Sequence, residues 1–214
     1  MKKILFVCLL ILGCLTLFAQ TPAGPQAVST TEKPTVRVPP QLDAAALKKI
    51  YSNLGTKTDP YWVNAYSWEL AGPNAAGGPH FIALPFTPKS NSTVEQVQVA
   101  VFYKSGDNQV NLSIYGDAGG LPGTLLAGPV TVTNLATAGT CCNLAVANFT
   151  PLAVTAATQY WVVADAPASG TGSDFIGVWN HVAKDLPLSF NRGKGWNADT
   201  ADNLPAGEVL GTIP

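Results

Sequence analysis

Charged residues are scarce in this sequence, and their scarcity excludes several classes of partner. Only 12% of the 214 residues are Asp, Glu, Lys or Arg, and the formal net charge is -1. Nucleic acids and anionic membranes are attracted by basic surfaces, so neither is expected as a partner. The polar surface must come instead from Thr, Ser, Asn and Gln, which suits an extracellular β protein.

Residues that bind metals or perform catalysis are also few. The two histidines, His80 and His181, are isolated, and no CxxC or HExxH spacing occurs, so no metal site and no cofactor are predicted. The sequence has no GxSxG nucleophile motif. Two carboxylates could flank a glycosidic bond, but the sequence does not give their separations. We therefore predict no enzyme and no catalytic residue, and keep a glycan-active hydrolase as the third hypothesis. The carboxylates considered are Glu69, Glu95, Asp117, Asp165, Asp174 and Glu208.

The only long apolar run lies at the N-terminus. Two lysines precede Ile4–Phe18, which is too short to cross a bilayer comfortably, so residues 1–19 are predicted to be a secretory signal peptide. The alternative is a lipoprotein anchored through Cys14, which ends a lipobox-like ILGC. We expect a secreted, extracellular or cell-surface protein without a transmembrane span in its mature form.

Composition divides the remaining chain in two. Residues 20–41 contain five prolines and few large apolar groups, which is typical of a semi-extended linker. Residues 42–214 are long enough to bury a sizeable core, and no second linker divides them. One domain is therefore predicted. Within it, a weak helical pattern near Asp43 predicts a short helix over residues 43–53.

Alternating polarity predicts antiparallel β structure in this domain. Apolar side chains recur at every second position in residues 93–106 and again in 108–117, and the turn residues 106–108 between them predict a hairpin. Residues 158–165 are apolar at both parities, as in a central strand that is covered on both faces. The fold prediction is an all-β, jelly-roll-like antiparallel sandwich. Further short strands are expected within residues 80–86, 129–134, 174–180, 187–190 and 208–212.

Turn-forming residues are concentrated in residues 115–123, YGDAGGLPG. Asp117 can accept hydrogen bonds from the backbone of the following residues, and the Pro-Gly centre of residues 121–124 predicts a type II turn. The alternative is that Asp117 holds calcium together with loop carbonyls or Asp107. The spaced carboxylates of a known calcium loop are absent, so the structural turn is preferred.

Several short motifs occur in an order that resembles a known bacterial family. The chain resembles the choice-of-anchor R domain proteins over about residues 48–213. This resemblance implies an exported β-rich domain of undetermined activity that is displayed at the cell surface, with no catalytic residues to carry over. The chain departs from the family pattern at residues 156–158, where a glycine is usual, and it ends at Pro214 without a C-terminal sorting helix, so we expect no attachment by that route. The motifs are NLG at 53–55, GPN at 72–74, ALPFTP at 83–88, YGDAGGLPG at 115–123, GTCC at 139–142, LAVTAATQYWVV at 152–163, VWN at 178–180, GW at 195–196 and VLGT at 209–212.

Two adjacent cysteines, Cys141 and Cys142, are the only ones left after removal of the signal peptide. In an oxidising compartment without other thiols, a vicinal disulfide is the leading prediction. Its ring needs a departure from strand geometry, because neighbouring side chains of a strand point to opposite faces. The alternatives are two reduced, buried cysteines or, less favoured, an intermolecular link.

Aromatic side chains near expected loops suggest ligand binding. Trp179 and Trp196 are the best candidates for flat faces that contact sugar rings, with Asn180 as a hydrogen-bonding partner, whereas Trp161 is expected in the core. The first hypothesis is therefore a non-catalytic recognition or adhesion module that binds a glycan or a cell-surface polymer. The alternative is a purely structural surface protein, which requires only a stable exported sandwich on a stalk.

Overall fold

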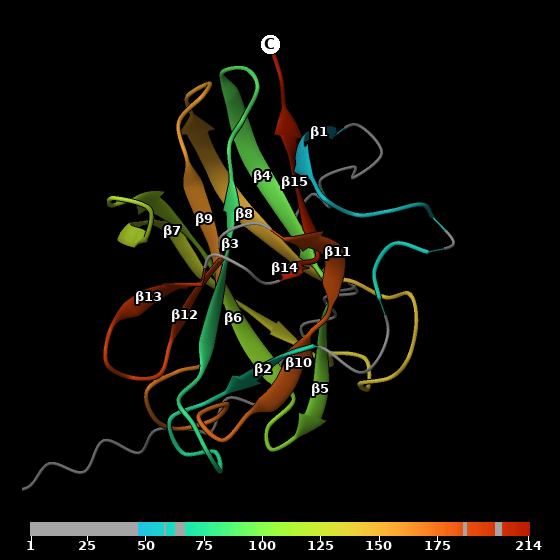
Figure 1. Ribbon diagram of the computed structural model, residues 1–214, viewed down its shortest axis with the longest axis vertical. Helices are drawn as coiled ribbons and strands as arrows, with labels where there is room; N and C mark the ends of the chain where they lie inside the picture. The colour runs from blue at the N-terminus through green and yellow to red at the C-terminus, as the bar shows by residue number, and fades with distance from the viewer. Residues whose placement is uncertain (1–46, 58, 63–66, 186–187, 200–202) are drawn as a thin grey trace, which may run out of the picture. The chain divides into compact units, whose positions relative to one another are not determined.

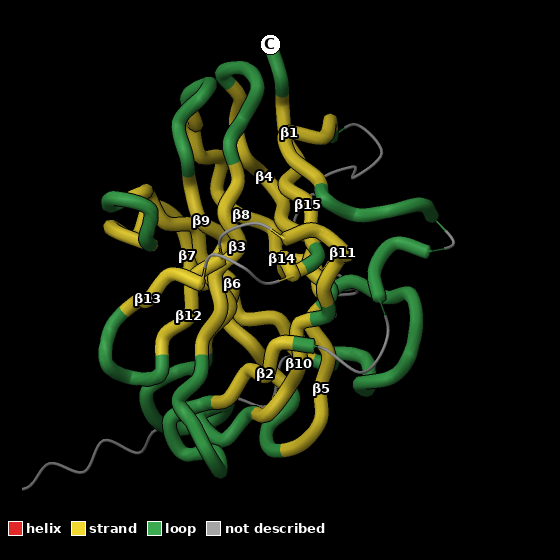
Figure 2. The backbone as a smooth tube through the Cα atoms, in the orientation of Figure 1, coloured by secondary structure: helices red, strands yellow, loops and turns green. Residues whose placement is uncertain are grey.

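Antiparallel strands make up the regular structure of this protein. The computed structural model describes residues 47–214 except 58, 63–66, 186–187 and 200–202, and these ranges contain no helix (Figure 2). Leu42–Pro214 is one compact unit. The predicted signal peptide, Cys14 and the predicted linker lie outside the described residues.

Eight of the strands form a jelly roll. One layer has the strand order β1-β15-β4-β8, and the other contains β3-β9-β6-β7. All these pairs are antiparallel, and the chain passes between the layers in the order of two Greek keys. The predicted all-β sandwich is therefore confirmed. The eight strands are β1 (Lys48–Ser52), β3 (Phe81–Phe86), β4 (Ser92–Val99), β6 (Gln109–Asp117), β7 (Pro122–Thr133), β8 (Ala145–Val154), β9 (Tyr160–Asp165) and β15 (Gly207–Thr212).

Seven shorter strands extend this framework. Two of them complete a six-stranded sheet of order β13-β12-β3-β9-β6-β7, in which β12 pairs with β3 and β13 pairs with β12. Three form a sheet of order β2-β10-β5, which lies at the opposite end of the sandwich from β1 (Figure 1), and the last two pair with each other. Their bounds are β2 (Trp68–Ala71), β5 (Val101–Ser105), β10 (Ile176–Trp179), β11 (His181–Asp185), β12 (Leu188–Asn191), β13 (Trp196–Asp199) and β14 (Asn203–Pro205).

The main core lies between the layers and consists of the alternating apolar side chains that the sequence predicts. From the six-stranded sheet, Leu84, Leu112 and Val162 are fully buried, and Val97 and Val209 meet them from the opposite layer. Strand β9 is central, with β3 on one side and β6 on the other, and all of its residues except the last are buried. The prediction of a central strand covered on both faces is confirmed.

The predicted continuous strand at residues 93–106 is wrong, because it breaks at Ala100. The Ala100 amide donates to Ala206 O (3.0 Å), the Asn180 amide donates to Ala100 O (2.9 Å), and the Ala206 amide donates to Asn180 O (2.8 Å). These bonds form a seam at which β4, paired with β15, gives way to β5, paired with β10.

The predicted hairpin at residues 106–108 is also wrong. Strand β5 pairs with β10, whereas β6 pairs with β9 and β7, so this turn crosses between two sheets. Local turn chemistry was identified correctly, since Gly106 adopts a positive φ of 78°. The partners of the flanking strands are set by the seam, which local sequence does not reveal.

The predicted helix at residues 43–53 is wrong in the part that the structure describes. Residues Lys48–Ser52 form β1, which pairs with β15 at the edge of the first layer. Pairing with β15 and burial of Ile50 in the core outweigh the weak helical pattern.

Candidate functional site

Two of the three predicted ligand-binding residues are buried. Trp179 is fully buried, and its indole N–H donates to Ala206 O at 2.9 Å. Asn180 is 2% exposed, and its side-chain oxygen accepts a hydrogen bond from Ser67 Oγ at 2.6 Å. Both residues belong to the seam and the core and present no face to a ligand, which corrects the expectation from the sequence.

The third, Trp196, lies on the outer face of the six-stranded sheet, the face turned away from the main core. It packs with Tyr115 against a small cluster formed by Ala83, Trp161 and Val163. Trp161 is 1% exposed, as expected for a buried residue, but it belongs to this cluster rather than to the main core. We call these five residues the outer cluster.

Strand register explains how the outer cluster is built. Tyr115 is opposite Trp161, and Ala83 is opposite Val163, so their side chains share one face. Ser113 and Ser189 are level with Ala83 and Val163, and all four are buried. Ser113 and Asn111 alternate with the apolar core residues of β6 and therefore point away from the main core, but the outer face buries both.

A second row of side chains, most of them polar, crosses the same face two residues along the strands from Ala83 and Val163. On one side, Thr131 is opposite Asn111, and Asn111 is opposite Asp165. On the other side, Trp196 is opposite Asn191, which is opposite Phe81. Because Ile82 pairs with Ala164, continuing that register by one residue places Phe81 level with Asp165. We call these six residues the polar row.

The polar row contains a directed chain of hydrogen bonds. Thr131 Oγ1 donates to Asn111 Oδ1 at 2.9 Å, which leaves the amide nitrogen of Asn111 to donate to the Asp165 carboxylate. Burial raises the pKa of Asp165 to about 6, and the hydrogen bond from Asn111 opposes this rise. Asp165 is thus a partly buried acid at the end of a chain of donors.

Ser189 on β12 has a buried hydroxyl group beneath the outer face. Its side-chain oxygen is completely buried and makes no hydrogen bond to any group in the described part of the chain. A buried hydroxyl without a partner costs free energy, so such groups are rare and often mark a functional site or a bound water.

Asp117 anchors Trp161 and the tip of the β6–β7 hairpin. One carboxylate oxygen accepts from Trp161 Nε1 (2.8 Å) and Gln159 Nε2 (2.7 Å), and the other accepts from the Gly120 amide (3.0 Å). Burial raises the pKa of Asp117, but hydrogen bonds from these groups and from Gly119 outweigh this effect and hold it below its usual value. The predicted Asx-type turn at Asp117 is confirmed.

The turn itself differs from the expectation of a type II turn at residues 121–124. The Ala118 amide donates to Leu121 O at 2.8 Å, and the two residues between them, Gly119 and Gly120, have φ values of 68° and 84°. This is the two-residue hairpin turn that requires positive φ twice. Pro122 already belongs to β7. No group of three His, Cys, Asp or Glu side chains that could hold a metal ion occurs in the described ranges.

A cleft of about 780 Å³ adjoins the outer cluster at Trp161. Strand β12 pairs with the first half of β3 only, and the cleft lies beside the second half. Its lining contains lysines, hydroxyls and an amide, but no carboxylate among the residues described. The polar side chains of the lining are those of Lys49, Tyr51, Ser52, Thr87, Lys89 and Gln159.

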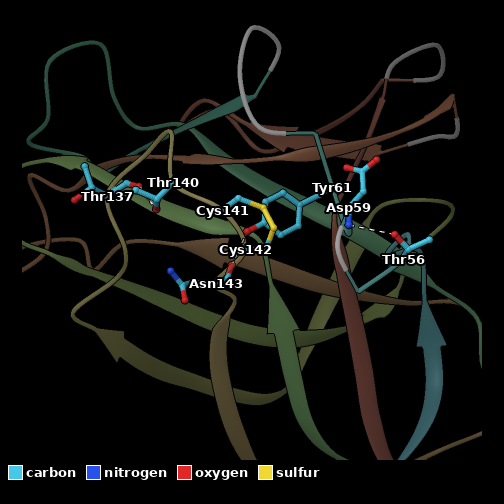
Figure 3. Close-up of a disulfide and its surroundings, with 8 residues drawn as sticks. All are labelled: Thr56, Asp59, Tyr61, Thr137, Thr140, Cys141, Cys142 and Asn143. Carbon is cyan, nitrogen blue, oxygen red and sulfur yellow. Dashed lines mark hydrogen bonds between the residues drawn. A yellow bond between two sulfur atoms is a disulfide. The ribbon is translucent and has the colours of Figure 1, made fainter.

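Cys141 and Cys142 form the predicted vicinal disulfide (Figure 3). Both residues are exposed, in a loop before β8, so the alternative of two buried thiols does not apply. The neighbouring Asn143 carbonyl accepts a hydrogen bond from Tyr61 Oη at 2.9 Å. Burial raises the pKa of Tyr61 to about 12, so this phenol remains a donor at neutral pH.

The six carboxylates considered for hydrolysis are all engaged by other groups of the protein. Glu69 and Glu208 form ion pairs with Lys104 (3.8 Å) and Lys49 (3.1 Å). The other four carboxylates accept hydrogen bonds, and their donors are Thr212 for Glu95, the Asp107 amide for Asp174, Asn111 for Asp165, and the groups given above for Asp117.

Comparison with protein-family models and with curated proteins finds no match. No protein-family model matches the chain, and no curated protein matches it significantly. The resemblance to choice-of-anchor R proteins therefore stays a prediction. The described residues contain no helix that is long and apolar enough to cross a membrane.

Sequence reasoning identified Trp196 but missed the rest of the outer face. Asp165 was considered only as a possible catalytic acid, and Asn111 only as part of the alternating segment at residues 108–117. The available signal was the alternation of polar residues at 109–117, together with Asp165 at the end of the central strand. The pairing of these two strands brings Asn111 and Asp165 together. The register itself is a tertiary feature.

Proposed function

We propose that this chain is an exported, non-catalytic recognition module that binds a glycan on the outer face of its six-stranded sheet. The observation that carries the proposal is the partly exposed Trp196, which packs against the same buried cluster as Tyr115 and lies next to a row of amide, hydroxyl and carboxylate groups. Aromatic faces suit the apolar faces of sugar rings, and the polar groups suit their hydroxyls.

Two further observations support recognition over hydrolysis. The cleft beside Trp161 has room for part of an oligosaccharide, and its described lining includes no carboxylate to act as acid, base or nucleophile. Each acid considered for catalysis is held by a partner of its own. The jelly roll itself does not decide the matter, because one fold hosts many functions.

A glycan array with the purified protein tests this proposal. We expect saturable binding that is lost in Trp196→Ala. Trp62→Ala is the matched control: Trp62 is 50% exposed but contacts His181 with a ring separation of 5.5 Å, away from the outer face, so this variant should bind normally.

The array also separates the alternative functions. Absence of binding to every sugar would contradict the proposal and favour a purely structural surface protein. Release of reducing sugar from a bound polysaccharide would contradict the non-catalytic part and favour a hydrolase. Export is tested separately, by finding the processed chain outside the cytoplasm.

A further inference from the structure

We infer that Asp165 is the polar anchor of this glycan site and that it selects neutral sugars with adjacent free hydroxyl groups. The inference rests on the function proposed above and assigns its ligand class. It starts from the directed chain of hydrogen bonds from Thr131 through Asn111 to Asp165.

The first step is the hydrogen-bonding capacity of the carboxylate. An ionised carboxylate has two oxygens and about four acceptor positions. In the described part of the chain, Asn111 is the donor shown for Asp165. The remaining positions are partly removed from water, so they gain more from new donors than a solvated carboxylate would. Two adjacent sugar hydroxyls supply two such donors.

The second step is position. Asp165 shares the outer face with Trp161, four residues away along β9, which corresponds to about 13 Å. Trp196 lies on the same face across β12 and β3. An oligosaccharide can therefore contact the carboxylate and an aromatic side chain together. Ser189, whose buried hydroxyl makes no described hydrogen bond, lies level with Ala83 between the polar row and Trp161.

The third step is charge. Burial and the charge of Asp165 both raise the pKa of Tyr115 on β6. The residues level with Asp165 on the neighbouring strands, Asn111 and Phe81, are uncharged. On the adjacent β12–β13 hairpin, the Arg192 guanidinium lies over the Phe190 ring at 5.7 Å. A uronic acid placed at Asp165 would bring two carboxylates together without a cation shown to neutralise them, which opposes binding.

The experiment measures binding of the purified protein to neutral polysaccharides (mannan, xylan and cellulose) and to the uronate polymers alginate and polygalacturonate. We expect binding to at least one neutral polymer at about pH 8 and a loss of at least tenfold in Asp165→Asn, because hydrogen bonds to an ionised group are strong. Binding by the unmodified protein should fall similarly at about pH 4.5, where the carboxylate is protonated.

Glu69→Gln is the matched control, because it makes the same carboxylate-to-amide change on β2, in the three-stranded sheet. It should bind like the unmodified protein, and circular dichroism should show that both variants are folded. Unchanged binding by a folded Asp165→Asn, or a preference for the uronates, would overturn the inference. If Trp196→Ala still abolishes binding in that case, the proposed function survives. If no polymer binds, the proposed function fails and the inference fails with it.

Discussion

Both faces of the six-stranded sheet contain fully buried residues, but different parts of the molecule cover them. Leu84, Leu112 and Val162 on the inner face are covered by the opposite layer of the sandwich. Ala83 and Val163 on the outer face are equally buried, yet the partly exposed side chains packed against them are Trp196 and Tyr115 of the same sheet. Substitutions on the inner face should therefore unfold the protein, whereas substitutions on the outer face should separate binding from stability.

Trp179, which belongs to the main core although it lies in the three-stranded sheet, and Trp196 on the outer face give the sharpest test of this difference. Trp179→Ala removes a fully buried indole and should lower the free energy of unfolding by about 3–5 kcal/mol. Trp196→Ala should change it by only about 1 kcal/mol while abolishing glycan binding. Urea unfolding monitored by circular dichroism measures both. Equal losses of stability would show that the main core and the outer face do not differ.

Asp117→Ala should have the next largest effect on stability, about 2 kcal/mol, because it leaves the buried Trp161 indole N–H and the Gly120 amide without their acceptor. Since hydrogen bonds hold the pKa of Asp117 below its usual value, its contribution should be present at neutral pH and lost as the pH falls through the folded-state pKa. Urea unfolding across this pH range checks the sign. Asp117→Asn, which keeps one acceptor oxygen, should lose less, and an equal loss would contradict the assignment.

Asp165→Asn should stabilise the protein by about 1–2 kcal/mol at about pH 8 while weakening glycan binding. The pKa of Asp165 is raised to about 6, so between about pH 4 and 6 the folded protein binds more protons than the unfolded chain. Stability of the unmodified protein should therefore fall as the pH rises through this interval. The gain in Asp165→Asn should vanish near pH 4. Thermal unfolding of both proteins across this range measures the effect, and destabilisation by Asp165→Asn at pH 8 would contradict it.

The smallest effect is expected at the Cys141–Cys142 disulfide, in an exposed loop outside both faces. The bond closes almost no loop, so its reduction should change stability by less than about 1 kcal/mol. Intact mass should show two hydrogens fewer than the dithiol and no alkylation before reduction, then two labels after it. Two labels before reduction would show that the bond is absent.

Alternation and turn chemistry were sufficient to predict the sandwich, because each strand shows its two faces in its own sequence. The central position of β9 followed from the apolar residues at both of its parities. The break at Ala100 could not be predicted, since hydrogen bonds with Asn180 and Ala206, distant in the sequence, produce it. The same holds for the candidate site. The local sequence indicated Trp196 as a possible binding residue. Only the strand register shows that Asp165, and not Trp179, shares its face.

The seam also constrains how the length of this chain can change. One peptide unit from each of three segments, at Ala100, Asn180 and Ala206, joins the four-stranded sheet to the three-stranded sheet. An inserted residue just after Ala100 would shift β5 by one position against β10 and exchange the environments of Phe102, which is fully buried, and Tyr103. Insertions in the exposed loops meet no such constraint, so variation in length among related chains belongs in those loops rather than at the junction of the sheets.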